Sequence, residues 1–205
     1  MLDLSRKLTD ELVLGDDVYP LNISFNKVLK TIELINDDDI EELYKPFLAI
    51  QILTGVDFTQ ALTPEQATAI FKMVFEEHIR LIPARDTAPV LDLAGNPIKS
   101  KIRSRSQSET SARLFSLKYD AEYIYSSFMQ AYGIDLIDAQ NILHWKKFNA
   151  LLNGLPSDTK FSEVIKIRAY KPQKGDSKKY RESMKELKKE YAHLKILTTS
   201  LERRE

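Results

Sequence analysis

The side chains of this sequence best suited to acid-base catalysis or metal binding are three histidines, His78, His144 and His193. They fall in three different predicted helices, and none has a second histidine or a carboxylate at the spacing of a recognised metal motif. His144 precedes Trp145 and is the best candidate of the three for a catalytic role. The alternative, which we favour, is a partly buried histidine that holds a helix or a backbone carbonyl in place.

Clustered carboxylates are the second possible source of chemistry. Asp37, Asp38 and Asp39, followed by Glu41 and Glu42, could attract a divalent cation, but the glycine and the terminal glutamate of a calcium loop are missing. A helix start explains them better, since carboxylates interact favourably with the positive end of the helix dipole.

Elsewhere, Asp120 and Glu122 are two residues apart and would point to different faces of a helix, so they form no acid-base pair. The sequence has no P-loop, GxGxxG, GxSxG or HExxH motif. We therefore expect a protein that is not an enzyme, with no catalytic residue, no metal and no cofactor.

Charge is balanced overall but unevenly distributed. The 205 residues include 30 acidic and 30 basic side chains and are 43% hydrophobic. Residues 1–82 carry 15 acids and 7 bases, whereas residues 161–205 carry 7 acids and 13 bases. Such opposed ends favour head-to-tail contacts between copies or a partner of mixed charge, and intramolecular pairing explains them equally well.

The lack of cysteine and of long apolar segments bears on where in the cell the protein is found. The sequence contains no cysteine, which fits a reducing cytoplasm. No segment has the apolar core of a signal peptide, and no run approaches the ~18 apolar residues of a membrane span. We expect the protein to stay in the cytosol and not to bind membranes.

The pattern of apolar residues predicts a mainly α fold. Residues 1–82 form the first predicted unit, a β-hairpin (11–14 and 18–21) followed by three helices. The first helix follows Ser24, the second runs from Asp39 to Leu53 with a bend or break at Pro46, and the third begins at the capping box of Thr63 and Gln66. Residues 83–114, rich in proline, serine and arginine, are predicted to be a linker or insertion.

Aromatic residues are concentrated in the third predicted segment, residues 115–170, which hold ten of the nineteen. Short helices are expected to start at Asp120, at Asp138, and at Ser157 or Asp158. They are too short to be stable alone, so their aromatic faces must pack together, dock a partner, or both. Residues 171–205 are predicted to form a long basic helix starting at Asp176, either packed on its own domain or in a coiled coil.

Several segments of this sequence resemble a known phage family. They are DAEYIY at 120–125, FMQAYGIDL at 128–136, LHWKKFNALLNGLP at 143–156 and TKF at 159–161, followed by Ile167-Arg168 and the lysine-rich final helix. They are similar to the bacteriophage gene-product-fifteen family of tail-gene clusters. The likeness covers about half of the chain well and extends more loosely to Glu11–Ile35.

The resemblance implies a function in tail assembly. Members of this family are typically encoded between the major tail protein and the tape-measure protein, which is the position of a tail assembly chaperone. Such a chaperone coats the long helical tape-measure protein in the bacterial cytoplasm and keeps it soluble until the tail tube assembles. A structural tail component and, less favoured, a nucleic-acid-binding regulator using the 99–113 segment and the final helix are the alternatives.

The expected partners follow from this reading. The tape-measure protein is the first, and the tail tube protein and further copies of the chain in a spiral are the others considered. Nucleic acid is not favoured, because the net charge is zero. A protein that binds a long helix needs moderately apolar grooves, so we predict that aromatic and apolar side chains bind the partner. The predicted partner-binding residues are Tyr123, Tyr125, Phe128, Tyr132, Trp145, Phe148, Tyr180, Met184, Leu187 and Tyr191.

Overall fold

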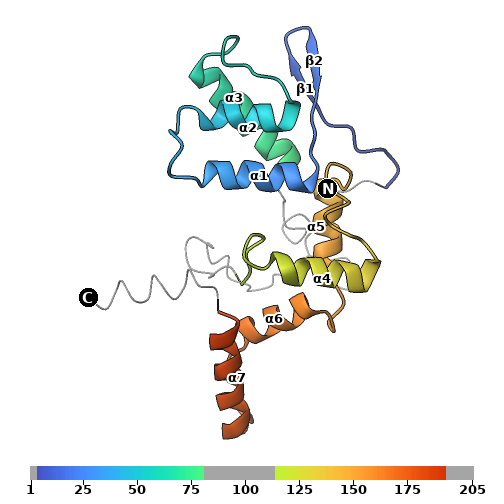
Figure 1. Cartoon of the computed structure of the whole chain (residues 1–205), viewed down its shortest axis with the longest axis vertical. Helices are drawn as coiled ribbons and strands as arrows, with labels where there is room; N and C mark the ends of the chain where they lie inside the picture. Colours follow the sequence, from blue (N-terminus) through green and yellow to red (C-terminus); the bar gives the residue numbers. More distant parts are fainter. Residues whose placement is uncertain (1–3, 81–113, 193–205) are drawn as a thin grey trace, which may run out of the picture. The chain divides into compact units, whose positions relative to one another are not determined.

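Helices make up most of the computed structural model, which describes residues 4–80 and 114–192 (Figure 1). This confirms the predicted mainly α fold with an N-terminal β-hairpin. The elements in chain order are β1 (Glu11–Leu14), β2 (Asp17–Pro20), α1 (Phe25–Ile35), α2 (Lys45–Thr54), α3 (Pro64–Val74), the π-helix η1 (Phe75–Ile79), α4 (Ala121–Tyr132), α5 (Trp145–Asn153), α6 (Lys160–Ala169) and α7 (Lys178–Glu190).

The chain divides into two compact units, and the division is not sequential. The described part of unit 1 comprises residues 4–80 together with Ile137–Asn153, and that of unit 2 comprises residues 114–136 and 154–192. The sequence grouped residues 115–170 in one aromatic unit. In the structure, the segment that contains α5 packs instead in unit 1, because its backbone and rings find their partners there.

The hairpin of unit 1 forms where the sequence predicts it. Leu14 pairs with Asp17, so β2 begins one residue earlier than expected and the turn has two central residues, Gly15 and Asp16. Gly15 has a φ of 63°, which glycine adopts without the steric cost that a side chain adds. Leu12 is buried, while Val13 and its partner Val18 face solvent, so only one face of the hairpin contributes to the core.

The three helices that follow pack in sequence, α1 on α2 and α2 on α3. Thr63 accepts a hydrogen bond from the Gln66 backbone N–H, and the Gln66 side chain accepts one from the Thr63 N–H, which confirms the predicted capping box. The second helix starts at Lys45 rather than at Asp39. Pro46 lies in the first turn of this helix. Backbone N–H groups in the first turn have no partner within the helix, so the missing N–H of proline costs nothing there, and Pro46 helps to start the helix instead of bending it.

The segment from Ile137 joins unit 1 through backbone pairing. The Phe25 N–H donates to the Leu143 carbonyl (3.0 Å), and the Trp145 N–H donates to the Ile23 carbonyl (2.8 Å). Ser24 therefore stands in a short antiparallel bridge with His144 as well as at the N-cap position of α1. Its side chain makes no capping hydrogen bond, contrary to the prediction.

In unit 2, α4 packs against α6, and α6 packs against α7. Ser127 of α4 is fully buried, and its hydroxyl accepts a hydrogen bond from the Phe161 N–H (3.0 Å) in the first turn of α6. This bond satisfies one of the backbone donors that every helix start leaves free. Gly133 ends α4 in the left-handed conformation with a φ of 65°, as predicted.

Three other helix starts differ from prediction. The helix expected from Asp138 begins only at Trp145, after a series of turns. The next helix has Thr159, not Ser157 or Asp158, at its N-cap, and the last has Ser177, whose hydroxyl accepts the Tyr180 N–H. The predicted linker at 83–114 lies outside the described residues except for Leu114, as does the end of the basic helix beyond residue 192.

Candidate partner-binding surface

Three of the predicted partner-binding side chains lie in the core. Phe128, Trp145 and Phe148 are exposed by 0%, 4% and 2%, respectively. The Phe148 ring stacks on Phe25 of α1 with the ring centres 4.9 Å apart, and Trp145 donates its indole N–H to the Ile79 carbonyl (2.8 Å). Trp145 and Phe148 thus join α5 to the rest of unit 1, while Phe128 of α4 is buried in unit 2, so none of the three rings is available to a partner in this structure.

The other seven predicted residues all belong to unit 2 and are at least partly accessible. Tyr180 is 49% exposed, and the remaining six are half-buried: Tyr123, Tyr125, Tyr132, Met184, Leu187 and Tyr191. Helix α7 has no buried residue in the part of the chain that the structure describes. Its apolar stripe, Tyr180, Met184, Leu187 and Tyr191, is therefore only partly covered by its own unit.

Two tyrosine rings on α4 are held by contacts with neighbouring side chains. Tyr125 donates its hydroxyl to Asp135 (2.8 Å), and Tyr123 meets Tyr191 edge to face with the ring centres 6.1 Å apart. Lys160 of α6 donates to the Tyr191 hydroxyl (2.8 Å), and this hydrogen bond raises the pKa of the lysine. The exposed parts of these rings are thus presented from fixed positions, which lowers the entropy that binding would lose.

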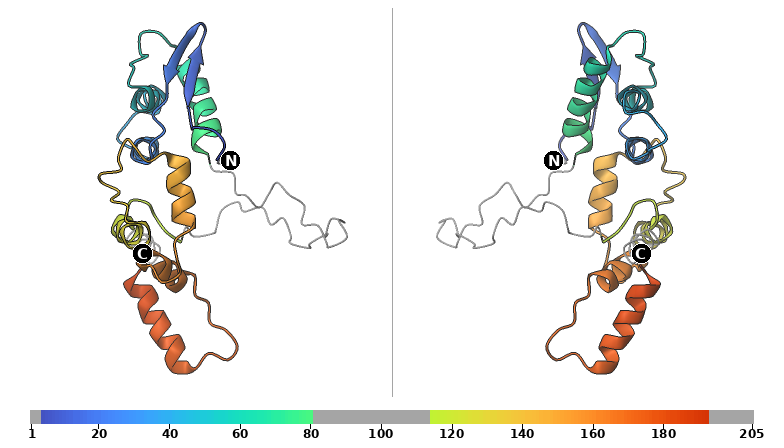
Figure 2. Two further views of the ribbon diagram at one scale, coloured as in Figure 1. Left: turned by 90° about the vertical axis from the view of Figure 1, so that its right-hand side faces the viewer. Right: turned by 90° about the vertical axis from the view of Figure 1, so that its left-hand side faces the viewer.

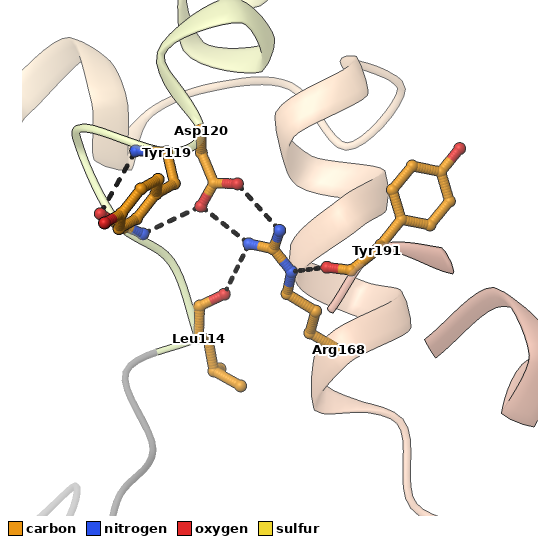
Figure 3. A network of polar contacts seen from close by, with 6 residues as sticks. Leu114, Tyr119, Asp120, Arg168 and Tyr191 are labelled. Atoms are coloured by element: carbon orange, nitrogen blue, oxygen red, sulfur yellow. Dashed lines mark hydrogen bonds and ion pairs between the residues drawn. The ribbon is translucent and has the colours of Figure 1, made fainter. Parts of the chain in front are cut away.

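Arg168 is the centre of the polar network that holds unit 2 together (Figure 3). Its two terminal nitrogens donate to the two carboxylate oxygens of Asp120 (2.7 and 2.8 Å), a bidentate ion pair. Its remaining hydrogen bonds go to the carbonyls of Leu114 (3.0 Å) and Tyr191 (2.7 Å). One side chain therefore ties the start of α4, the end of α6 and the end of α7.

Asp120 is the acceptor of this network and not the helix cap that the sequence predicts. It stands at the N-cap position of α4, but its carboxylate makes no capping hydrogen bond. The carboxylate accepts the Ser116 N–H (2.9 Å) as well as Arg168, and it is only 1% exposed. A buried charge of this kind is tolerated when it is paired and hydrogen-bonded, as here.

A second polar contact fixes the entrance to α7. Tyr170 donates its hydroxyl to Asp176 (2.6 Å), and Asp176 also accepts the Gln173 N–H (2.8 Å). The hydrogen bond raises the pKa of the Tyr170 phenol to about 12, and it lowers the pKa of the Asp176 carboxyl. Asp176 thus closes the turn before α7 rather than capping the helix.

The histidines that sequence analysis treated separately come together in unit 1. Asp10 lies between two of them, accepting a hydrogen bond at Oδ1 from Nδ1 of His78 (2.7 Å) and at Oδ2 from Nε2 of His144 (2.7 Å). The Asp10 side chain is 7% exposed and each histidine side chain is 13% exposed. The favoured reading, a partly buried His144 in a holding role, agrees with this position.

The hydrogen bonds assign the proton positions on the His144 ring. Its Nδ1 accepts the Lys146 backbone N–H (3.0 Å), so its proton is on Nε2, facing Asp10. Burial raises the pKa of Asp10, but the hydrogen bonds from His144 and His78 outweigh it, and the pKa lies below the ordinary aspartate value. The cluster is a charged acceptor between two ring donors, which fastens three distant segments of unit 1.

The cluster is held by hydrogen bonds between its own side chains and to the Lys146 backbone. Both carboxylate oxygens of Asp10 are occupied by ring N–H groups. Within residues 4–80 and 114–192, no group of three or more His, Cys, Asp or Glu side chains could hold a metal ion. His193 lies outside the described residues. No helix in the described part of the chain is long and apolar enough to cross a membrane.

Sequence reasoning missed the Asp10, His78 and His144 cluster and the pairing of Asp120 with Arg168. No local signal could have revealed either one, since Asp10 and His144 are 134 residues apart and Asp120 and Arg168 are 48 apart.

Comparison with known proteins identifies a family. The sequence profile of the family described as "Bacteriophage Gp15 protein" matches residues 8–193. No curated protein matches the chain. No solved structure matches it either.

Proposed function

Because the chain belongs to the bacteriophage Gp15 family, we propose that it is a tail assembly chaperone that binds the phage tape-measure protein in the host cytoplasm and keeps it soluble. The family match, which covers residues 8–193, carries this proposal. The gene order associated with the family indicates the partner, because these proteins are typically encoded beside the tape-measure protein. The chain itself acts as a binding protein without catalysis.

Unit 2 supports the proposal physically. The tape-measure protein is long and helical, and a partner helix is commonly bound by an apolar surface that spans several turns. The stripe on α7 runs from Tyr180 to Tyr191 and leaves its side chains half-buried or exposed. Tyrosine rings are frequent at such surfaces, since they bury a large area and keep a polar hydroxyl.

Affinity purification tests the proposal. The tagged chain is purified with nuclease from cells that express the phage tail-gene cluster, and partners are identified by mass spectrometry. We expect the tape-measure protein with several copies of the chain. Recovery of the chain alone, or incorporation of the chain into purified virions as a permanent part, would contradict a chaperone; the second result would favour a structural tail component.

A pair of variants connects the result to the surface. Tyr180→Ala with Met184→Ala removes two members of the α7 stripe, and we expect recovery of the tape-measure protein to fall by roughly tenfold or more. The matched control is Lys179→Ala with Glu186→Ala, which changes two exposed side chains of the same helix outside the stripe. Equal losses in both variants would show that the stripe is not the binding surface.

A further inference from the structure

Unit 2 has a basic hollow beside α7. The segment that leads into α7 runs back along this helix (Figure 2), and between them lies a cavity of about 310 Å³. Its walls are the rings of Tyr170 and Pro172 and one face of α7, formed by Lys178, Arg181, Glu182, Lys185 and Lys188. We call this the basic hollow. Four cations and one carboxylate line it.

The positive charge of the basic hollow is only partly balanced by its own unit, where Glu182 lies in the wall and Asp176 interacts electrostatically with Arg181. Arg181 and Lys188 donate hydrogen bonds to the backbone carbonyls of Gln173 (3.0 Å) and Tyr170 (2.9 Å), which carry no net charge. Lys178 and Lys185 make no ion pair within the described residues. Because a carboxylate from elsewhere would find several cations and apolar ring surface together, the hollow suits an acidic segment with apolar neighbours.

Unit 1 carries a segment with that composition. Residues 37–44 read Asp-Asp-Asp-Ile-Glu-Glu-Leu-Tyr and form the turn between α1 and α2; we call them the acidic corner. The last four residues of the acidic corner, 41–44, are all exposed, and the side chains of Leu43 and Tyr44 are exposed by 53% and 51%. Glu42 pairs with Lys45 of its own unit.

Three other carboxylates of the acidic corner, on Asp38, Asp39 and Glu41, are exposed and make no ion pair within the described residues. The corner therefore offers free negative charge next to two large exposed apolar side chains. Each feature has a counterpart in the basic hollow, where cations stand beside the rings of Tyr170 and Pro172.

We propose that the acidic corner of one copy docks in the basic hollow of the next copy, so that the chain associates head to tail. Each chain has one corner and one hollow, which are different surfaces, so the contact is heterologous and leaves a free surface at each end. Such a contact extends into an open chain of copies unless the rotation closes a ring. The hollow and the α7 stripe use different faces of α7 and meet at Tyr170, whose ring contacts Tyr180 edge to face with the ring centres 5.7 Å apart.

A second copy fits the basic hollow better than nucleic acid does. A phosphate backbone is usually tracked by a continuous basic groove, whereas this hollow is a short concavity with Glu182 in its wall. The whole chain also has no net charge to attract a polyanion. The acidic corner, in contrast, supplies both carboxylates and apolar surface.

Paired charge reversals test the contact. One variant carries Lys178→Glu and Lys185→Glu in the basic hollow, and the other carries Asp38→Lys and Glu41→Lys in the acidic corner. All four positions are exposed, and circular dichroism checks that each variant folds. Sedimentation velocity then measures the mass of the full chain up to about 1 mM in 0.1 M NaCl, where even a weak contact is populated.

We expect the unaltered chain to associate with rising concentration, and each variant alone to associate roughly tenfold or more weakly. Mixing the two variants should restore association, because each contact then joins surfaces of opposite charge. About 1 M NaCl should weaken association of the unaltered chain, since it shortens the screening length to about 3 Å. Restoration on mixing is the decisive result, because contacts within one chain cannot produce it.

Reversal of exposed charges elsewhere provides the matched controls. These are Lys179→Glu with Lys189→Glu on another part of α7, and Asp16→Lys with Asp17→Lys at the hairpin turn. Neither control should change the association. A strictly monomeric chain at about 1 mM, equal effects of controls and test variants, or no association on mixing would each overturn the proposal.

Discussion

Removal of the Asp10 carboxylate is the most informative perturbation of unit 1. In Asp10→Ala, the ring N–H groups of His78 and His144 lose the carboxylate to which both donate, in a site where the three side chains are 7% to 13% exposed. Hydrogen bonds to a charged group contribute about 1.5–3 kcal/mol each, and this variant removes two of them. We expect Asp10→Ala to lower the free energy of unfolding by about 3–5 kcal/mol.

Asp10→Asn should be less severe, because the amide is close in shape to the carboxylate. Its oxygen can accept from His144, whose proton must stay on Nε2 because Nδ1 accepts the Lys146 N–H. Its NH₂ group can donate to His78 if that ring moves its own proton from Nδ1 to Nε2. Two neutral hydrogen bonds then replace two charge-assisted ones, and the expected loss is about 2 kcal/mol.

The assay is urea unfolding followed by the fluorescence of Trp145, which is the single tryptophan of the chain and is 4% exposed in unit 1. Asp16→Ala, on the exposed hairpin turn, is the control and should change stability by less than about 0.5 kcal/mol. A loss below about 1 kcal/mol for Asp10→Ala, with an unchanged dependence on urea, would refute the assigned role of the cluster.

The same group gives a pH dependence with a defined sign. The folded pKa of Asp10 is lowered, so the unfolded chain binds its proton more readily. The stability that ionised Asp10 contributes is therefore fully present above the ordinary aspartate pKa of about 4 and is lost as the pH falls through the lower folded pKa. The Asn variant should lack this contribution.

Three further predictions concern single contacts. Arg168→Gln leaves the Asp120 carboxylate buried without its cation, so we expect a loss of about 3–5 kcal/mol in unit 2, measured as faster hydrogen exchange of α4 and α6 amides; unchanged exchange would contradict this. Thr63→Ala removes the capping box of α3 and should cost about 1 kcal/mol in urea unfolding, whereas no shift of the midpoint would argue against the cap. In an NMR titration of the phenols, Tyr170 should ionise with a pKa of about 12, and Asp176→Asn should return it toward 10; an unshifted value in that variant would show that the hydrogen bond is not the cause.

Local signals predicted the elements that depend on a few neighbouring residues. The capping box at Thr63 and the αL glycine at Gly133 each specify a helix end through contacts within four residues, and both are confirmed. Pro46 was interpreted as a break inside a helix, although its preference for the first turn explains the observed start at Lys45. Where the signal is local but has two interpretations, sequence alone leaves the choice open.

Contacts between distant segments were not predictable in the same way. The rings at Trp145 and Phe148 have the helical spacing of an apolar face, but the spacing does not say that this face packs on Phe25 in unit 1. Similarly, the lysines and the arginine that line the basic hollow share one face of α7 in the sequence, whereas the opposing wall at Tyr170 and Pro172 depends on the turn before α7. The candidate surfaces therefore needed the tertiary structure.

A co-expression experiment tests most directly whether the chain keeps the tape-measure protein soluble, as we propose. The tape-measure protein is expressed alone, with the unaltered chain, and with the Tyr180→Ala and Met184→Ala variant, and its soluble fraction is measured after centrifugation. We predict a large soluble fraction only with the unaltered chain. A soluble fraction that is the same with and without the chain would contradict the claim.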